Sequence, residues 1–321
     1  MARPTKELPL STTGLTASSE KTFLQKLLNQ KALLVMSIPF LIWLFIFKYM
    51  PLWGWTMAFQ DYKIARSFSE QQWIGLSTFQ KMLTDDYFWL VLRNTIVMSF
   101  IQIVLGFVTA ITLAILLNEL KNILFKRVVQ TISYLPHFIS WVVAANIVTT
   151  VLAAEGIINE VLMRLGLLDS PILWLLKGEY FWGIFGATIT WKELGWNTII
   201  YLAAITMIDP SLYEAAEMDG ASRWRKIWHI TLPGMRSVIV ILLIMNLGYI
   251  IESGFEPQYL LRNGTNKDFS ENLDIYVLDY GMKMADYSLS TAASMFKTIV
   301  SFIFLFSANA IAKRLGESRL F

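Results

Sequence analysis

The sequence predicts an all-α polytopic membrane protein with six transmembrane helices. Of its 321 residues, 55% are hydrophobic and only 16% are charged, whereas soluble domains usually carry about 25% charged residues. A spanning helix needs about 20 mainly apolar residues, and the segments that meet this requirement are 32–58, 94–118, 128–153, 181–207, 236–252 and 289–312. We therefore expect residues 32–321 to form one transmembrane domain behind a polar N-terminal tail at 1–31.

The first span contains Pro39 and Pro51, which predict a kink within one span rather than two separate spans. The tail before it lacks the basic start, the apolar stretch and the small-residue cleavage site of a signal peptide. We therefore expect the tail to be retained.

The distribution of basic residues predicts the orientation. About 15 Lys and Arg residues fall in the tail, the 121–127 turn, the 209–236 loop and the C-terminal end, against about nine in the longer connections at 59–93, 154–180 and 253–288. Short loops rich in Lys and Arg stay in the cytoplasm. Both termini and the 209–236 loop are therefore expected on the cytoplasmic side.

The composition argues against several other classes. A net charge of +3 is too small to indicate a nucleic-acid partner, so membrane lipid is the expected surrounding. The chain has no cysteine, and its two histidines, His137 and His229, lie far apart. No HExxH or GxSxG motif is present, which disfavours an intramembrane hydrolase. We expect no catalytic residue and no metal site.

A charged stretch, YEAAEMDGASRWRKIWHITLP, lies between the fourth and fifth spans. Before it, Asp209 and Pro210 indicate an N-cap followed by proline at the first helical position. Gly220 stands where a left-handed residue ends a helix, and Ser222 can cap a second helix that Pro233 would end. We therefore expect a helix–glycine–helix hairpin, with one stripe of the first helix formed by Leu212, Ala215, Ala216 and Asp219.

Two interpretations of this hairpin remain open on physical grounds. An amphipathic loop could lie on the lipid headgroups, anchored by its tryptophans and arginines. Alternatively, the hairpin could dock onto a soluble partner, because the small Ala215 and Ala216 allow close approach.

The hairpin also resembles the EAA signature of permease subunits in bacterial ABC importers of type I. The matching residues are Glu214, Ala215, Ala216, Gly220, Ile230, Leu232 and Pro233. The resemblance implies that residues 209–235 are the coupling loop, which sits in a groove of the ATP-binding subunit. Glu214 would then meet a basic residue of that partner, and Gly220 would give the turn between the helices.

Further stretches resemble the carbohydrate-uptake branch of these permeases, including FKYMPLWGWTMAFQDYK at 47–63, YLPHFISWVV at 134–143 and the final IAKRLGE. The subgroup is similar to permeases for fragments of rhamnogalacturonan or alginate. This resemblance implies a multi-pass protein of the bacterial cytoplasmic membrane that imports oligosaccharides. It also implies a second homologous permease, a dimer of ATP-binding subunits and an extracytoplasmic solute-binding protein as partners.

The chain lacks the G-x-x-x-x-G-K-[ST] loop that cradles ATP. We therefore expect this chain to bind no cofactor, with Mg-ATP held by the partner subunit. An ion-driven secondary transporter and a membrane-embedded enzyme are the alternatives, and neither of them needs a cytoplasmic docking hairpin.

Polar residues inside the spans predict the substrate pathway, because they are costly in lipid. The fourth span contains Trp191, Lys192, Glu193, Trp196 and Asn197. Tryptophan faces would stack on sugars, and Lys192 would suit a uronate carboxylate; alternatively, Lys192 and Glu193 only pair with each other. In the fifth span, a second polar face expected to join the same cavity consists of Asn246, Tyr249 and Glu252.

Overall fold

The computed structural model describes residues 30–252 and 254–316, so nearly all of the predicted tail at 1–31 lies outside the described residues. The chain divides into two units, Met1–Gly54 and Trp55–Phe321. Helices make up most of the described chain, as the composition predicts.

The first unit contributes a long apolar helix. It consists of α2 (Lys31–Leu44) and a π-helical turn, η1 (Phe45–Tyr49), followed by the 3-10 helix η2 (Met50–Phe59), which runs into the second unit. The α-helix continues through Pro39. Residues 31–59 are long and apolar enough to form one membrane span, which confirms the prediction of a single span here.

The second unit begins with a small hairpin in which β1 (Gln60–Asp61) and β2 (Gln72–Trp73) pair antiparallel on either side of η3 (Phe68–Glu70). The remaining elements are all helical. In chain order they are α3 (Ser77–Leu83), α4 (Asp86–Glu119), α5 (Ile123–Tyr134), η4 (Leu135–Phe138), α6 (Trp141–Val151), α7 (Ile157–Arg164), η5 (Trp174–Leu176), η6 (Gly178–Tyr180), α8 (Phe181–Thr206), α9 (Pro210–Met218), α10 (Arg223–Lys226), η7 (Ile227–Thr231), α11 (Leu232–Gly248), α12 (Glu256–Leu261), α13 (Lys267–Ser270), α14 (Leu273–Leu278), η8 (Asp279–Lys283) and α15 (Tyr287–Arg314).

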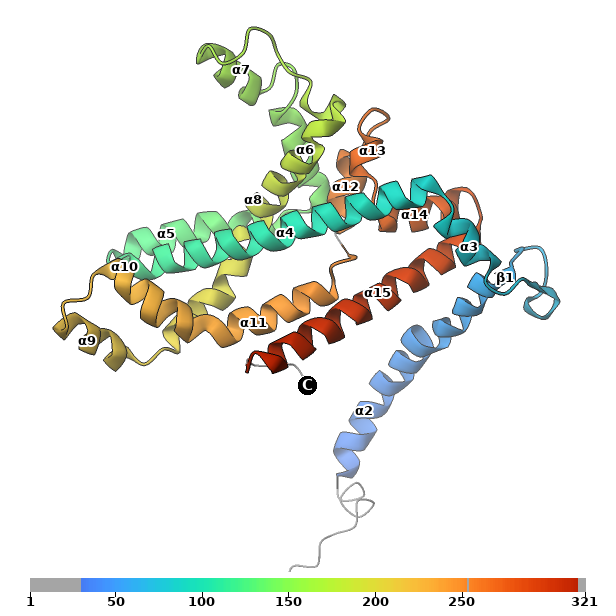
Figure 1. The fold of residues 1–321 in the computed structure, drawn as a ribbon, viewed down its shortest axis with the longest axis horizontal. Coiled ribbons are helices and arrows are strands. Elements are labelled where there is room, and N and C mark those ends of the chain that lie inside the picture. Colours follow the sequence, from blue (N-terminus) through green and yellow to red (C-terminus); the bar gives the residue numbers. More distant parts are fainter. Residues whose placement is uncertain (1–29, 253, 317–321) are drawn as a thin grey trace, which may run out of the picture. The chain divides into compact units, whose positions relative to one another are not determined.

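The helices α4 and α8 form the centre of the second unit (Figure 1). Small alanines on α4, Ala110 and Ala114, face Tyr201 and Ala204 of α8 and Met235 of α11 in one buried cluster. Further along α4, a second cluster joins it to α6, α8 and α12, and a third joins it to α3, α14 and α15. Burial of apolar side chains along α4 therefore holds α3, α6, α8, α11, α12, α14 and α15 around it.

The third predicted span, 128–153, is not one helix. The segments 123–138 and 141–151 meet at an angle of 104°, and Figure 1 shows α5 and α6 meeting in a corner. The break follows from local chemistry, because Pro136 lacks a backbone N–H and Ser140 caps a new helix by accepting a hydrogen bond from the N–H of Val143. A second bent pair, 178–206 with 210–218, meets at 69°. The described chain has four helices long and apolar enough to span a membrane, or up to six if each of these two bent pairs counts as one span.

The second hairpin helix does not end at Pro233, contrary to the prediction. One continuous helical segment runs from Arg223 to Gly248. A π-helical turn at η7, just before Pro233, changes the hydrogen-bond pattern where a proline would otherwise conflict with a regular α-helix. The second arm of the hairpin and the fifth span therefore form one continuous helical segment. It ends at Gly248, four residues before the predicted end at 252.

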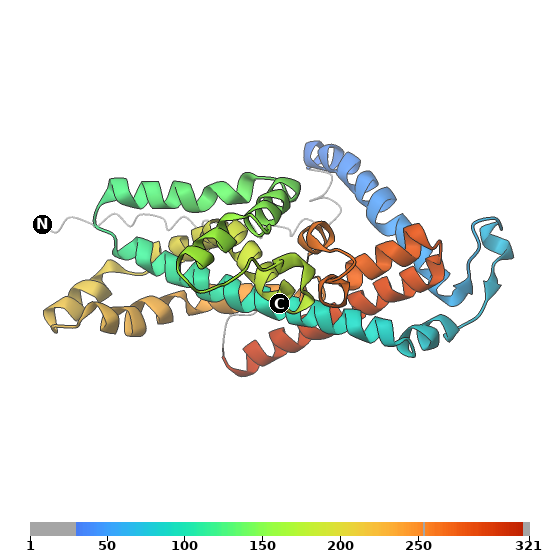
Figure 2. The ribbon, with the colours of Figure 1, turned by 90° about the horizontal axis from the view of Figure 1, so that it is seen from above.

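Several connections of the second unit lie at the two ends of α4, whereas the segments that carry α7 and α13 project from its side (Figure 1). Seen in two directions, the α9–α10 hairpin and the turn between α4 and α5 lie at one end of α4, and α3 lies at the other (Figures 1 and 2). At the α3 end, the Lys81 ammonium lies 3.3 Å from the Asp286 carboxylate, which ties α3 to the start of α15. The 121–127 turn and the 209–236 loop, both expected in the cytoplasm, therefore lie at the same end of α4.

Candidate functional site

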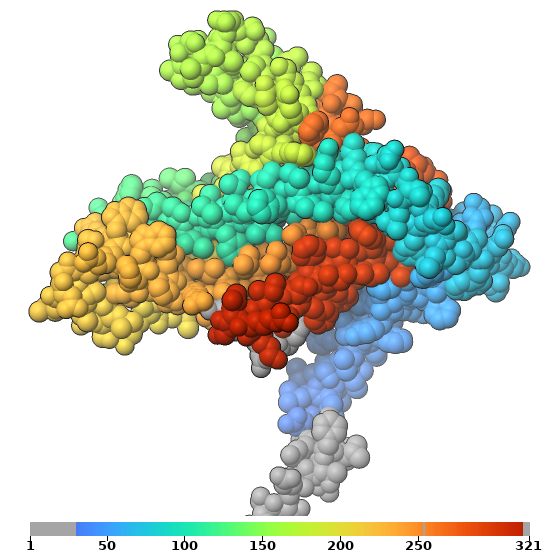
Figure 3. Space-filling model, in the orientation of Figure 1, coloured from blue at the N-terminus to red at the C-terminus, as the bar shows by residue number. Residues whose placement is uncertain are grey.

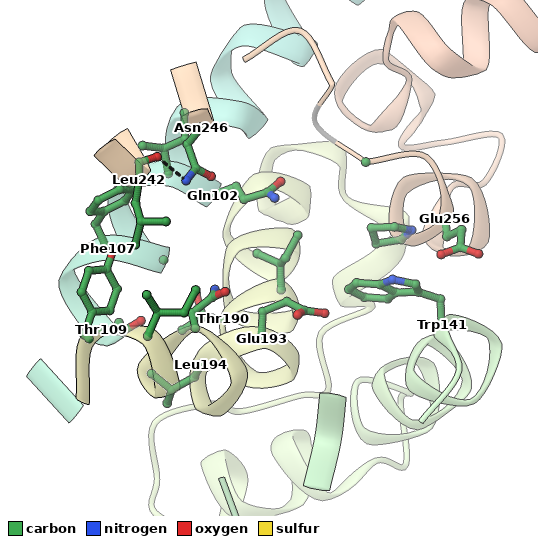
Figure 4. A pocket seen from close by; sticks show the side chains of 18 of the residues that line it. Gln102, Phe107, Thr109, Trp141, Thr190, Glu193, Leu194, Leu242, Asn246 and Glu256 are labelled. Carbon is green, nitrogen blue, oxygen red and sulfur yellow. Dashed lines mark hydrogen bonds between the residues drawn. The ribbon is translucent and has the colours of Figure 1, made fainter. Parts of the chain in front are cut away.

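A polar cavity of about 350 Å³ lies between α4, α8, α11 and the start of α12, with α6 at its edge (Figure 4). Its lining includes amides, hydroxyls and two carboxylates, together with the indole of Trp141. The polar members are Gln102, Thr109, Thr190, Glu193, Asn197, Tyr201, Asn246 and Glu256. Sites for small ligands combine apolar walls with a few placed polar groups of this kind.

Two buried polar atoms in this lining have no partner among the described residues. They are the carbonyl oxygen of the Gln102 side chain, on α4, and the hydroxyl of Thr190, on α8. Leaving a buried polar group without a hydrogen bond costs about 1–3 kcal/mol. A water molecule or a hydroxyl-rich ligand in the cavity would relieve that cost.

The predicted residues of the fourth span separate onto different faces of α8. Glu193 and Asn197 line the cavity. Trp191 instead faces an apolar groove between α6 and α8, and Trp196 stacks on the His137 imidazole with ring centroids 4.4 Å apart. Because a helix has 3.6 residues per turn, side chains that are adjacent in the sequence point in different directions. The side chains of this short motif therefore lie in different environments.

Lys192 does not line the cavity, and its proposed contact with a sugar carboxylate has no support in the geometry. The side chain is buried, and its ammonium donates a 2.8 Å hydrogen bond to the backbone carbonyl of His137 in η4. The same ammonium lies 3.6 Å from a Glu193 carboxylate oxygen. The pairing alternative for Lys192 and Glu193 is therefore present in the structure, and it extends to the corner between α5 and α6.

Two further contacts attach this corner to α8. The other carboxylate oxygen of Glu193 and Nδ1 of His137 lie 2.8 Å apart in a hydrogen bond. Gly195 packs directly against the end of α5, where an added Cβ would collide with the backbone carbonyl of Ser133 and lie 2.8 Å from the Tyr134 ring. The absence of a side chain at Gly195 therefore lets the corner sit on α8.

The polar residues predicted in the fifth span also separate. Asn246 lines the cavity, whereas Tyr249 and Glu252 line a different groove, of about 360 Å³, between the end of α11 and α15. In this structure the three residues do not share one cavity, because α11 ends at Gly248 and the next residues form a turn with a hydrogen bond from the Glu252 N–H to the Tyr249 carbonyl. Helical spacing no longer applies beyond that point.

An ion cluster fixes α12, which carries the cavity residue Glu256. The Arg262 guanidinium, at the end of α12, lies 3.2 Å from the Asp279 carboxylate and 3.4 Å from that of Glu271. Burial, together with the negative charge of Asp279, raises the pKa of Glu271 to about 7, although Lys283 works in the opposite direction. Burial also works to raise the pKa of Asp279, but hydrogen bonds from Lys283 and Arg262 hold it below its usual value.

The hairpin α9–α10 forms as its capping residues predict. The carboxylate of Asp209 accepts a hydrogen bond from the Ser211 N–H, which also lowers the pKa of Asp209, and Ser222 caps α10. Gly220 has φ +70°, and the Ala221 N–H bonds to the Ala216 carbonyl. This arrangement is the Schellman motif that ends many helices.

Two side-chain contacts join the two arms of the hairpin. Lys226 forms a 3.2 Å ion pair with Glu217, and the hydroxyls of Tyr213 and Thr231 lie 2.9 Å apart. The predicted coupling residues Glu214, Ala215, Asp219 and Gly220 are exposed, Ala216 is half-buried, and Ile230, Leu232 and Pro233 follow within η7 and the start of α11. The hairpin is therefore held by its own contacts.

The hairpin presents an open surface at its tip (Figure 3). Met218 is 88% exposed and Trp224 is 72% exposed. Glu214 forms no ion pair with any described residue. The exposed apolar side chains and the free carboxylate are features of a surface that contacts another molecule.

Several cavity residues were missed by sequence reasoning. Gln102 is the one that a signal could have found, because it is a polar residue within an apolar span. Trp141 and Glu256 reach the cavity from α6 and from the start of α12, and nothing local in the sequence indicates that position. Among the described residues, no group of His, Asp or Glu is placed to hold a metal ion.

The spanning helices, the polar cavity between them and the exposed hairpin define the chain as a membrane transport protein. The sequence pattern of the family described as "Binding-protein-dependent transport system inner membrane component" matches residues 102–317. The chain belongs to this family and is a permease subunit of an ABC importer.

Individual relatives are similar over nearly their whole length. The chain is 44% identical over 302 residues, 94% of each chain, to the polygalacturonan/rhamnogalacturonan transport system permease protein YteP of Bacillus subtilis (strain 168). It is 38% identical over 308 residues, 96% of each chain, to protein LplB of the same organism. A crystal structure of a bacterial alginate ABC transporter in complex with an alginate pentasaccharide-bound periplasmic protein contains a chain with TM-score 0.85 and 34% identity, covering 93% of this chain and 99% of that one. The chain therefore has the type I ABC importer permease fold in a multi-pass membrane protein.

Proposed function

We propose that the chain is one of two permease subunits in an importer of oligosaccharides released from acidic polysaccharides. The cavity between α4, α8 and α11 carries this proposal, because its amides, hydroxyls, carboxylates and indole suit the hydroxyl groups and apolar faces of sugars. The relatives that transport polygalacturonan and alginate fragments support the choice of acidic sugars.

Energy for transport comes from a separate dimer of ATP-binding subunits, which holds Mg-ATP, while this chain binds no cofactor. The exposed α9–α10 hairpin is the docking element, with Glu214 meeting a basic side chain and the small Ala215 and Ala216 allowing close approach. Two observations support this docking role: the hairpin surface is exposed, and the hairpin continues through η7 into α11 without a break. Movement of the hairpin is thus passed directly to a helix that lines the cavity.

The hairpin and both termini lie on the cytoplasmic side in this proposal. An extracytoplasmic solute-binding protein delivers sugar at the opposite end of α4, where the segments 60–85 and 279–287 lie. Supporting this arrangement, basic residues are enriched in the connections on the hairpin side. A second homologous permease completes the pathway.

Reconstitution in proteoliposomes tests the proposal. The chain is purified with the second permease and the ATPase of its own organism, and uptake of labelled oligogalacturonides is measured with the binding protein and ATP. Uptake should require all of these components, and maltotriose should be a poor competitor. Each component omitted singly provides the control.

Uptake by this chain alone, driven by a proton or sodium gradient, would contradict the proposal and favour a secondary transporter. ATP-dependent uptake of maltotriose but not of oligogalacturonides would retain the importer and reject the acidic cargo.

A further inference from the structure

A buried cation stands immediately behind the cavity wall. Lys192, on α8, is 4% exposed, and taking an ammonium group out of water is costly unless partners compensate for it. Its partners are the carbonyl of His137 at 2.8 Å, a carboxylate oxygen of Glu193 at 3.6 Å and the ring of Trp141, whose centroid lies 5.0 Å away. Three different kinds of group therefore converge on one charge.

Two of these partners form part of the cavity wall although they come from different helices. Glu193 belongs to α8 and Trp141 to the first turn of α6, and both line the cavity. Figure 4 shows their side chains pointing toward one another. The ammonium of Lys192 is near both of them, while Lys192 itself is not among the cavity residues.

The third partner fixes the corner from which α6 starts. The His137 carbonyl lies in η4, between α5 and α6, and carbonyls at helix ends lack intrahelical partners. Lys192 satisfies this carbonyl. It therefore holds the backbone that sets where Trp141 begins α6, as well as contacting the ring of Trp141.

We propose that Lys192 is a positioning residue that holds Trp141 and Glu193 in their sugar-binding arrangement and does not itself contact the sugar. The proposal rests on the proposed function. It makes a definite statement about specificity, because the cavity lining within the described residues includes Glu193 and Glu256 but no Lys or Arg. Selection of acidic over neutral sugars then does not come from Lys192.

Transport kinetics of reconstituted importer complexes test this role. Lys192→Met removes the charge and the donor, whereas Lys192→Gln keeps a donor for the His137 carbonyl. Loss of a charged hydrogen bond corresponds to about a tenfold effect or more. We expect KM to rise about tenfold in Lys192→Met, with a smaller change in kcat. Where both an acidic and a neutral oligosaccharide are transported, KM should rise by the same factor for each. In Lys192→Gln, the rise in KM should be smaller.

Lys177→Met is the matched control, because Lys177 also lies over an aromatic ring, that of Tyr180, but is exposed and outside the cavity lining. Lys177→Met should leave KM unchanged.

A double variant of Lys192→Met with Glu193→Gln should lose no more transport activity than the worse single variant, since both substitutions act on one arrangement of side chains. Multiplied losses, or a much larger loss for acidic sugars, would overturn the proposal.

A readout without sugar separates this proposal from the proposed function. The emission of Trp141 is obtained by subtracting the spectrum of a Trp141→Phe complex, and a charge beside an indole shifts its emission. Removing the charge in Lys192→Gln should shift that spectrum in the resting complex. An unchanged Trp141 spectrum in Lys192→Gln would reject the positioning role, and so would lower thermal stability of the Lys192 variants with unchanged KM. A wild-type complex that shows no uptake would instead reject only the proposed function.

Discussion

At the scale of single residues, the corner between α5 and α6 depends on close contact with α8. Gly195 is buried at this contact, and the carbonyl of Ser133 occupies the space where its side chain would be. His137 stacks on Trp196 and bonds to Glu193 beside it. The fourth-span motif is therefore mainly a support for the corner, with Glu193 and Asn197 as its contribution to the cavity.

Gly195→Ala should destabilise the chain by about 1–3 kcal/mol or more, because the added methyl group meets backbone that cannot move independently. Gly183→Ala is the control on the same helix, since a Cβ there meets nothing within 4 Å. That control should be neutral or slightly stabilising. Unfolding in detergent measures both, and equal stability of the two variants would show that the corner tolerates separation from α8.

At the scale of elements, the hairpin joins local capping to a long spanning helix. Asp209, Ser222 and the left-handed Gly220 define its shape through hydrogen bonds between near neighbours. The π-helical turn η7 then continues it into α11 without a break. One continuous helical segment therefore connects the second arm of the hairpin to the cavity residue Asn246.

Gly220→Pro should abolish ATP-driven uptake while membrane insertion and spanning helices remain intact. Proline requires φ near −65°, whereas Gly220 has φ +70°, so the turn between α9 and α10 must rearrange. A large residue at Ala216 should act similarly by blocking close approach. Uptake and ATP hydrolysis are measured together, and the expected result is hydrolysis without uptake.

Gly166→Pro provides the control for this variant. Gly166 ends α7 with φ +69° and the same pattern of closing hydrogen bonds, but it lies outside the hairpin. It should keep uptake coupled to hydrolysis. Normal coupling in Gly220→Pro would count against the hairpin as the docking element.

At the scale of the whole molecule, the proposed function requires that the hairpin and the α3 end of α4 face opposite sides of the membrane. Because the chain has no cysteine, single cysteines can report this directly. Met218 on the hairpin is 88% exposed, and Ile64, between β1 and β2, is 73% exposed. Both positions are open enough to react with a bulky reagent.

A membrane-impermeant maleimide should label Ile64→Cys but not Met218→Cys in spheroplasts, and the reverse in inside-out vesicles. The cysteine-free chain is the control for background labelling. Labelling of Met218→Cys from outside would reverse the predicted orientation and remove the hairpin from the cytoplasm.

The features that the sequence alone determined are those that depend on neighbouring residues. Apolar length predicted the spanning segments, and capping residues predicted the hairpin, because both arise from hydrogen bonding and hydrophobicity along a short stretch of chain. The corner after α5 was missed, although Pro136 and Ser140 are local signals for it. The continuation of the helix through Pro233 was also missed, because a proline usually ends or kinks a helix, whereas the π-helical turn η7 accommodates it here.

Only the tertiary structure decided which polar side chains share a cavity. Glu193 and Lys192 are adjacent in the sequence, yet one faces the cavity and the other faces the His137 carbonyl. Trp141 and Glu256 enter the site from separate helices. The direction of a side chain depends on where distant helices pack, and a buried charge is placed by whichever partner can compensate for its lost hydration. For Lys192, that partner is a carbonyl 55 residues earlier in the chain.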